Sequence, residues 1–236
     1  MMMIAQRARG CLGGAALPSS AMYLPPPFTC RDAALAAGIV RAHPLASLVT
    51  TDDDGMPEAS HLPMHLSITD DGRWTLWGHM ARANPQWRHL QARPQALATF
   101  LGPHAYQSPQ VYPDTARVPT WHYVAVHCRV TARLIGHDDA AAKDRLLKAL
   151  IDDHEPAYAD QWRARDEAFQ RRMLAGIAAF ELQVDEWQCA LKLNQHRPEA
   201  HAAMQARYAA GTPDERALAR WMERLGLLPA GAADAD

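Results

Sequence analysis

The chain has 236 residues, enough for one large domain or two small ones with a sizeable hydrophobic core. Hydrophobic residues make up 48% and charged residues 21% of the chain, a composition that excludes a wholly disordered protein. Lys and Arg number 24 against 26 Asp and Glu, and the net charge of -2 does not support DNA binding through a general basic excess.

Two further absences in the sequence bear on its location in the cell. No apolar run approaches the roughly 20 residues that a membrane-spanning helix needs. The four cysteines are scattered and form no CxxC pair, so neither a zinc knuckle nor a disulfide framework is indicated. We therefore predict a cytoplasmic protein that is not associated with a membrane.

Residues 1–21 are treated separately from the fold. They contain two arginines and the short apolar stretch CLGGAAL, which a secretory signal could also show, but its two glycines and its length argue against that interpretation. We predict that this segment is a disordered extension, dispensable for folding and for ligand binding, because no periodic apolar pattern would join it to a core.

From residue 22 onwards the pattern predicts a short arm, a helix and then antiparallel strands. The arm MYLPPPFTC is too rich in proline for a helix, whereas Leu35, Ile39 and Val40 show helical spacing after Asp32. Asp-Gly turns separate the next three apolar runs, which is typical of a meander. The expected elements are an arm (22–30), helices (31–43 and 82–93) and strands (45–51, 58–68, 73–80, 95–102 and 123–135).

The second half of the chain is mainly helical. The expected elements are helices at 138–156, 166–177, 197–209 and 213–228, with one strand at 179–194. Five or six antiparallel strands decorated by helices predict an α+β fold, mainly a small antiparallel barrel with a helical C-terminal segment. We divide it into a barrel domain at 22–209 and a C-terminal helix and tail at 210–236.

Metal and acid–base sites have little support in the sequence. His61 and His65 have the spacing that a helix uses for zinc, but the segment reads as a strand, where four residues span about 13 Å. Asp138 and Asp139 could be an acid–base pair, yet they fit better as caps of the helix that follows. We predict no metal site, and no residue stands out as a catalytic acid, base or nucleophile.

A ligand site is better supported at the segment GHMARANPQW, residues 78–87. Here Arg82 and Asn84 stand at a turn from a strand into a helix, where free backbone amides and a guanidinium suit a phosphate group. Further on, Trp121 and Tyr123 beside Thr120 offer the flat apolar surface and fixed polar groups that a planar ligand needs. The alternative is that the aromatic residues are core, Arg82 forms a surface ion pair and Asn84 only caps the helix.

A family resemblance favours the ligand site. The segments MYLPPPF, ASHLP, GHMARANPQW, GPHAYQSPQVYP, VPTWHYVAVH and LKLNQHRPEA resemble, in order, the PaiB-type FMN-binding negative transcriptional regulators. The resemblance runs from about Met22 to Ala206. It implies a flavin-type split barrel related to pyridoxamine phosphate oxidases, which dimerises and binds FMN at the subunit interface. It also implies repression of genes for degradative enzymes and sporulation.

The resemblance assigns cofactor contacts by position. It implies a strand beside the flavin, a ribityl and phosphate site, residues that line the ring, and a segment contributed by the partner subunit. The family's LSQN-type motif stands here as Leu193-Asn194-Gln195-His196, with two substitutions. The implied residues are, in the same order, Ser60, His61, Leu62 and Pro63; Gly78, His79, Arg82 and Asn84; Thr120, Trp121 and Tyr123; and Lys192, Asn194 and Gln195.

Three functions stay open at this point. The first is a flavin-linked transcriptional regulator or sensor, which could touch DNA or another protein although neither the charge nor a helix-turn-helix supports DNA. The second is an FMN-dependent oxidoreductase acting on a small molecule. The third is a haem-binding split barrel, since some split barrels use haem and the chain holds 12 histidines.

Overall fold

The computed structural model describes residues 22–114 and 116–228, so the predictions for residues 1–21 and for the tail after residue 228 lie outside it. The described chain is an α+β protein with a curved antiparallel sheet, as predicted. The strands are β1 (Thr29–Cys30), β2 (Leu45–Thr51), β3 (Pro57–Pro63), β4 (His65–Ile68), β5 (Trp74–Ala81), β6 (Gln95–Gln107), β7 (Thr120–Leu134) and β8 (Ile177–Lys192). The helices are α1 (Ala33–Ala42), α2 (Gln86–Ala92), α3 (Ala140–His154), α4 (Tyr158–Arg163), α5 (Glu167–Ala175), α6 (His201–Ala209) and α7 (Pro213–Arg224).

The sheet runs in the order β3-β2-β6-β7-β8-β5-β4, and β1 pairs with β8. The segment predicted as one strand, 58–68, is two strands, because the chain turns at Met64, whose amide donates to the carbonyl of Pro44. β3 then pairs with β2 and β4 with β5, so consecutive strands lie at the two ends of the sheet order. This crossing curls the sheet into a barrel.

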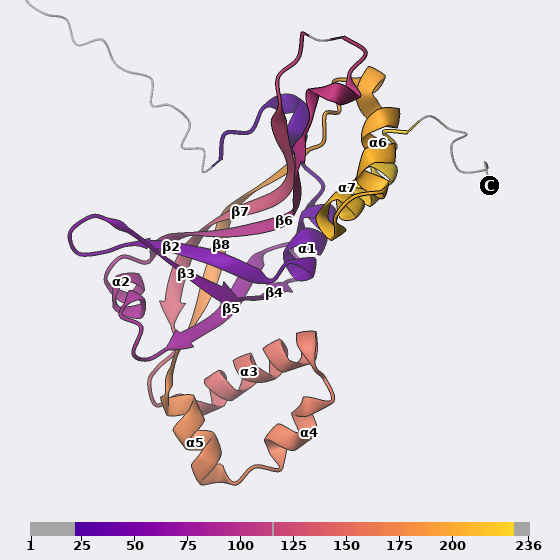
Figure 1. Ribbon diagram of the computed structural model, residues 1–236. Coiled ribbons are helices and arrows are strands. Elements are labelled where there is room, and N and C mark those ends of the chain that lie inside the picture. Colours follow the sequence, from indigo (N-terminus) through magenta and orange to yellow (C-terminus); the bar gives the residue numbers. More distant parts are fainter. Residues whose placement is uncertain (1–21, 115, 229–236) are drawn as a thin grey trace, which may run out of the picture.

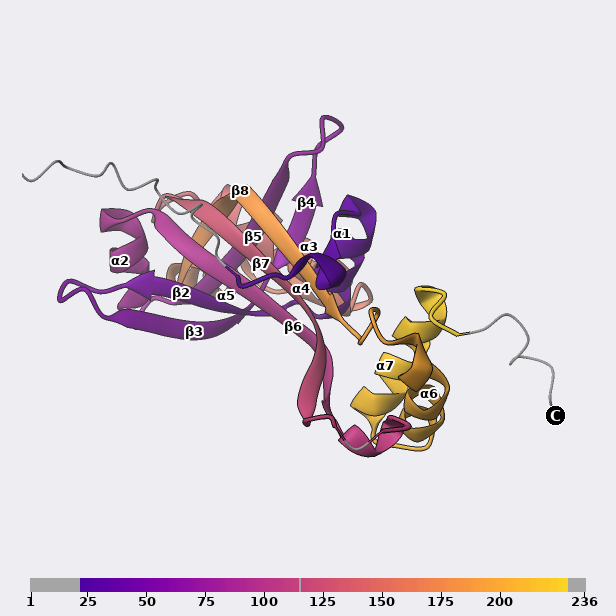
Figure 2. The ribbon, with the colours of Figure 1, turned by 90° about the horizontal axis from the view of Figure 1, so that it is seen from above.

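Three strands extend beyond the barrel. β6 continues to Gln107 rather than ending at residue 102, with a register shift between Leu101 and His104, and β7 starts at Thr120 rather than at residue 123. We call the part formed by residues 101–107, 120–125 and 189–192 the extension. Helices α6 and α7 lie against it, at one end of the molecule (Figures 1 and 2).

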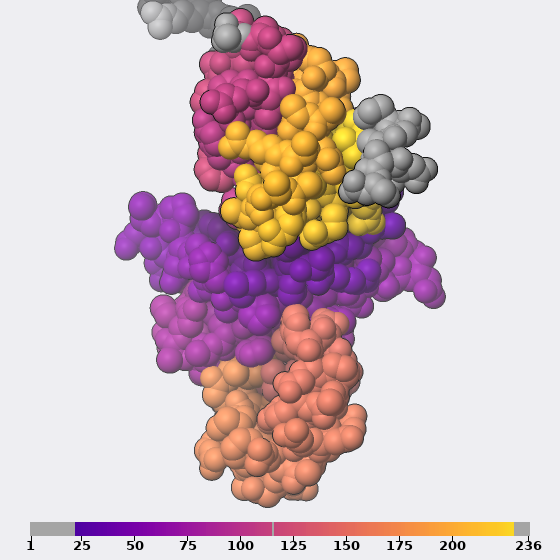
Figure 3. All heavy atoms as spheres, turned by 45° about the vertical axis from the view of Figure 1, so that its right-hand side comes forward, coloured from indigo at the N-terminus to yellow at the C-terminus, as the bar shows by residue number. Residues whose placement is uncertain are grey.

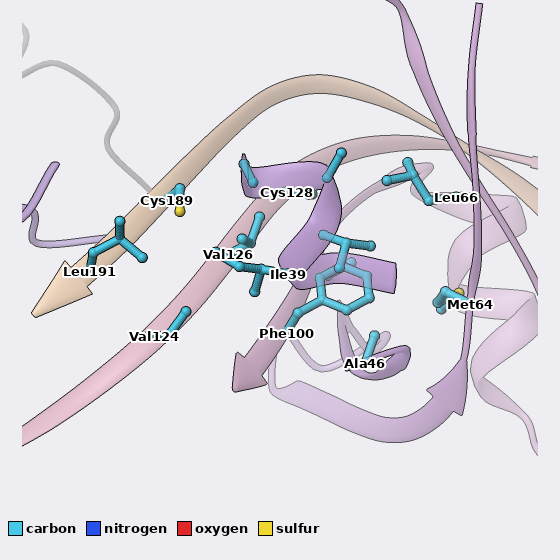
Figure 4. Packing of buried hydrophobic residues seen from close by; sticks show 14 of the residues in the cluster. Ile39, Ala46, Met64, Leu66, Phe100, Val124, Val126, Cys128, Cys189 and Leu191 are labelled. Atoms are coloured by element: carbon cyan, nitrogen blue, oxygen red, sulfur yellow. The ribbon is translucent and has the colours of Figure 1, made fainter. Parts of the chain in front are cut away.

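The hydrophobic core lies between helix α1 and the inner faces of the strands. Ile39 of α1 lies beside Phe100 of β6 and Val126 of β7, and Met64 belongs to the same cluster; all four side chains are almost fully buried (Figure 4). Alternating side chains on each strand explain why one face is apolar and the other is not. The same core continues to α6 and α7 through Tyr208 and other buried side chains, so the helix assigned to a separate C-terminal segment packs on the barrel.

Between β7 and β8 the chain forms a helical lobe of α3, α4 and α5, which lies at the opposite end of the molecule from α6 and α7 (Figure 3). Asp139 caps α3 by accepting from the amide of Ala142 at 2.9 Å, as its position predicts. Helix α4 was not predicted, because its six residues show no clear apolar period. The lobe is entered from Leu134 and left at Ile177, where β7 and β8 are already paired.

Candidate functional site

The fourteen predicted site residues form two groups on different strands of the sheet. The β3–β5 group consists of Ser60, His61, Leu62, Pro63, Gly78, His79, Arg82 and Asn84. The β7–β8 group consists of Thr120, Trp121, Tyr123, Lys192, Asn194 and Gln195.

The strand register shows how far parts of the two groups lie apart. Tyr123 pairs with Lys192, whereas Leu134 of the same strand pairs with Phe180, the partner of Gly78. The step from residue 123 to 134 is eleven residues, or roughly 35 Å of strand at about 3.3 Å each. His61 on β3 lies nearer to the β7–β8 group, since it pairs through β2 and β6 with a residue of β7 four positions from Tyr123. One subunit therefore does not bring Gly78 and Tyr123 around a single ligand.

Asn84 joins the three elements of the β3–β5 group. Its Nδ2 donates to Ser60 Oγ of β3 at 2.9 Å, and its Oδ1 accepts from the amide of Gln86 at 3.0 Å. Helix α2 starts one residue later than predicted, with Pro85 rather than Asn84 at its N-cap, but Asn84 still holds its first turn. Gln86 is fully buried and donates to the carbonyls of Leu48 and Glu58, which fixes α2 over β2 and β3.

The guanidinium of Arg82 lies beside this turn and stacks on an aromatic ring. Its guanidinium carbon lies 4.0 Å from the centroid of the Trp87 ring, and Trp87 Nε1 donates to the Arg82 carbonyl at 3.1 Å. Its amide donates to the carbonyl of Gly176 at 2.8 Å, where the helical lobe ends. Among the described residues no carboxylate pairs with Arg82, so the surface ion pair considered for it is not formed. A stacked guanidinium with unused N–H groups is suited to a phosphate.

The remaining members of the β3–β5 group have different surroundings. His61 is exposed and its Nδ1 lies 3.0 Å from Ser47 Oγ, while burial lowers the pKa of His79, whose Nδ1 is buried and meets no partner among the described residues. Gly78 faces the core: a Cβ there would lie 2.6 Å from Met64 Sδ, so the packing inside the barrel requires glycine. Leu62 and Pro63 are half-buried at the end of β3.

In the β7–β8 group, Lys192 is the central residue. Its Nζ donates to Thr120 Oγ1 at 2.9 Å and lies 5.5 Å from the centroid of the Tyr123 ring. Burial lowers the pKa of Lys192. Trp121 is 54% exposed and meets Tyr106 edge to face at 6.3 Å, so it belongs to the surface and not to the core.

Asn194 and Gln195 hold the turn after β8. Asn194 has a φ of 65°, and its Nδ2 donates to the hydroxyl of Tyr112 at 2.8 Å. Gln195 Oε1 accepts from the amide of Leu193 at 3.0 Å, and its Nε2 donates to the carbonyl of Leu191. These side-chain groups are therefore engaged within the chain.

Sequence reasoning missed three polar residues near the β7–β8 group. His122 and Arg117 line a pocket of about 330 Å³ together with Lys192 and Thr120, and Tyr208 of α6 lies against His122. Because side chains alternate along a strand, the exposure of Trp121 places the next side chain, His122, on the inward face. No signal in the sequence brings Tyr208, 86 residues later, to the same place.

Solved structures with the same architecture identify the fold as a split barrel of the kind that flavoproteins use. A flavocytochrome from Azotobacter vinelandii is 18% identical, with a TM-score of 0.53 over 70% of this chain and 69% of that chain. An FAD- and haem-binding protein from Mycobacterium smegmatis is 20% identical, with a TM-score of 0.52 over 70% of this chain and 73% of that chain.

A family comparison narrows the class. Residues 22–186 match the family model described as "Putative FMN-binding domain". The protein named protease synthase and sporulation protein PAI 2 of Bacillus subtilis is 34% identical over 180 residues, which are 75% of this chain and 84% of that protein. An uncharacterized protein of Saccharomyces cerevisiae is 34% identical over 101 residues, 41% of this chain and 59% of that protein. The chain belongs to the PaiB-type family of FMN-binding split-barrel proteins, and FMN is its cofactor.

Within residues 22–114 and 116–228, none of the helices has the length and apolar character to cross a membrane.

Proposed function

We propose that this protein is a flavin-linked negative transcriptional regulator or sensor whose FMN phosphate is bound by Arg82. The observation that carries the phosphate assignment is the Arg82 guanidinium, which is stacked on Trp87 and has no carboxylate partner within residues 22–114 and 116–228. Asn84 and Ser60 hold the turn beside it through their 2.9 Å hydrogen bond. The regulatory role is supported by the name of the Bacillus subtilis relative, which refers to protease synthase and sporulation.

The residues of the β3–β5 group would bind and orient the cofactor. The guanidinium of Arg82 supplies charge-assisted hydrogen bonds to phosphate oxygens, and the buried Nδ1 of His79 is a polar atom still without a partner in the described chain. When bound, FMN supplies the redox chemistry, while the protein determines its position and its surroundings. We propose a cytoplasmic location on the cysteine pattern.

The experiment on Arg82 compares FMN with riboflavin, which lacks the phosphate. In Arg82→Ala we expect FMN to bind about tenfold to a hundredfold more weakly, or roughly 1.5–3 kcal/mol, with riboflavin almost unaffected. Arg88→Ala is the matched control, because Arg88 also lies over Trp87, at 5.1 Å, but is exposed on α2. Equal losses for both ligands, or the same loss in Arg88→Ala, would contradict the phosphate assignment.

The proposed assembly is a homodimer with FMN at the interface. Leu101, Tyr106 and Trp121 on β6 and β7 are 57%, 44% and 54% exposed, a patch of large apolar side chains that a second copy of the chain would cover. Because Gly78 and Tyr123 are roughly 35 Å of strand apart in one chain, the β7–β8 group of one subunit would meet Gly78 and the residues around it in the partner. No basic excess supports direct DNA contact, so we propose a protein partner for the regulatory step.

Light scattering of the flavin-bound protein tests this assembly. We expect a dimer at micromolar concentration, and Trp121→Glu should yield monomers with weakened flavin binding, because a charge would be buried in the interface. Thr131→Glu, on the barrel part of β7, is the control. A flavin-bound monomer would exclude the shared site.

Two alternative functions are an FMN-dependent oxidoreductase and a haem protein. They are considered because the flavocytochrome and the FAD- and haem-binding protein have similar folds. An absorption spectrum of the purified protein separates flavin bands from a Soret band. Flavin reduction that depends on an added small molecule would favour the oxidoreductase.

A further inference from the structure

The pocket next to the β7–β8 group contains two side chains, His122 and Arg117, that the flavin assignment does not use. It holds about 330 Å³ and lies where β7 begins and β8 ends, against the segment before β7. This volume suits a small organic ligand. His122, Lys192 and Arg117 supply its polar lining, and Phe28, Tyr112 and Val118 supply its apolar lining.

The protonation of His122 is fixed by a chain of hydrogen bonds. Gln107 Nε2 donates to the carbonyl of Ser108, which leaves its Oε1 to accept from the Tyr208 hydroxyl at 2.8 Å. The Tyr208 oxygen, having given its proton to Gln107, accepts from His122 Nδ1 at 2.9 Å. His122 Nε2 therefore carries a lone pair, and among the described residues it has no partner. Burial, with the charges of Lys192 and His196, lowers the pKa of His122 to about 4, so the ring stays neutral at pH 7.

The pocket contains more cationic side chains than carboxylates that could pair with them. Lys192 donates to Thr120 Oγ1 and has no carboxylate partner among the residues described. Arg117 pairs with Asp114 at 2.9 Å and lies 3.8 Å from Glu199, while its buried Nε has no hydrogen-bond partner among the described residues. Glu199 is also 3.9 Å from Arg197, a third cation of the pocket lining. Three cations thus face two carboxylates, and the pocket can accommodate one more negative charge.

We propose that this pocket binds a small aromatic carboxylic acid that carries a hydroxyl group, as a substrate or effector bound in addition to FMN and beside the β7–β8 group. Its carboxylate would meet Lys192 and Arg117, and its ring would lie among the apolar side chains of the lining. Its hydroxyl would donate to His122 Nε2, an acceptor that the Tyr208 chain holds ready. The binding does not depend on the assignment of the flavin phosphate to Arg82.

Fluorine NMR of the full chain with its flavin bound tests whether the pocket recognises the carboxylate of the ligand. The probes are meta-fluoro-para-hydroxybenzoate, para-fluorobenzoate and the neutral para-fluorobenzyl alcohol. We expect Arg117→Met to weaken both acids about tenfold or more, with the alcohol and FMN unaffected. The control is Arg163→Met, which removes an arginine from an ion pair with Asp160 on α4. Equal affinity for acid and alcohol, equal effects of the two arginine variants, or a parallel loss of FMN affinity would overturn the proposal.

A second measurement addresses His122. Proton–nitrogen correlation NMR should show Nε2 as the unprotonated nitrogen of a neutral ring, and the hydroxylated acid should bind several-fold more tightly than para-fluorobenzoate. In His122→Phe this preference should disappear while the affinity for para-fluorobenzoate persists. If the variant does not fold, the NMR signals of the unaltered chain decide, and a proton on Nε2 would overturn the role of His122.

Discussion

The two helical regions at the ends of the molecule are attached in different ways. Helices α6 and α7 pack on the main core through fully buried side chains such as Met204, Tyr208 and Met222. Helices α3–α5 instead have a small cluster of their own, in which Leu146 and Leu150 of α3 meet Ala179 of β8. The first region is therefore part of the barrel's cooperative unit, whereas the second resembles an added unit whose stability is separate.

Their polar anchors differ too. In the lobe, Lys143 is almost fully buried, and its ammonium donates to the carbonyls of His137, Leu174 and Ile177 at 2.9, 3.0 and 3.3 Å. At the other end, the anchor is the neutral chain from Gln107 through Tyr208 to His122. One ammonium group that binds three carbonyls can organise a lobe that has only a small hydrophobic core. The neutral hydrogen bonds at the other end instead add specificity to packing that the main core already provides.

The largest effect should follow from removing the Lys143 charge. Lys143→Met leaves three carbonyls of the lobe without a donor, and we expect a loss of about 3–5 kcal/mol in the stability of α3–α5. Hydrogen exchange should show faster exchange in these helices, with the barrel strands still protected. Lys148→Met, which removes a half-buried ion pair with Asp144 on the same helix, should change stability by no more than about 1 kcal/mol. A uniform loss over the whole chain would mean that the lobe is not separate.

A pair of cavity variants sharpens the same comparison. Met222→Ala and Leu146→Ala each remove a fully buried side chain, at a cost of about 3 kcal/mol. Met222→Ala should lower the midpoint of global urea unfolding, whereas Leu146→Ala should accelerate exchange in the lobe and leave the barrel transition in place. Identical shifts of the barrel transition would contradict the difference in attachment.

The smallest expected change in folding stability is its dependence on pH through His122. His122 has a pKa of about 4 in the folded protein, below its usual value of 6.5, so the unfolded chain binds more protons between these values. Stability should therefore fall as the pH falls from 6.5 to 4, by about 2 kcal/mol from this group between pH 7 and pH 5. Burial also lowers the pKa values of His43 and His79, so urea unfolding of the wild type is compared with His122→Gln. Equal acid sensitivity of the two proteins would exclude His122 as the source.

The sequence predicted what depends on neighbours along the chain. Asp-Gly turns indicated the meander, Asp32 and Asp139 marked helix starts, and Arg82 and Asn84 were found at the strand-to-helix turn. The break at Met64 was missed because strand-like residues continue through it, and only the pairing of β3 and β4 with different partners reveals it. The separation of the two groups and the contact of His122 with Tyr208 depend on long-range register, which local patterns do not contain.

The position of the helical lobe within the chain has a consequence for how the protein can be altered. Leu134 pairs with Phe180, so the chain leaves the barrel at the end of β7 and returns beside the same point at the start of β8. The lobe is thus an insertion into a hairpin, and closing that hairpin with a short turn would cost little entropy. A shortened chain with such a turn should keep the barrel's pairing, since surface insertions with adjacent ends tolerate deletion. It would lose the carbonyl of Gly176 that accepts from the Arg82 amide, so the loop that carries Arg82 would gain freedom of movement.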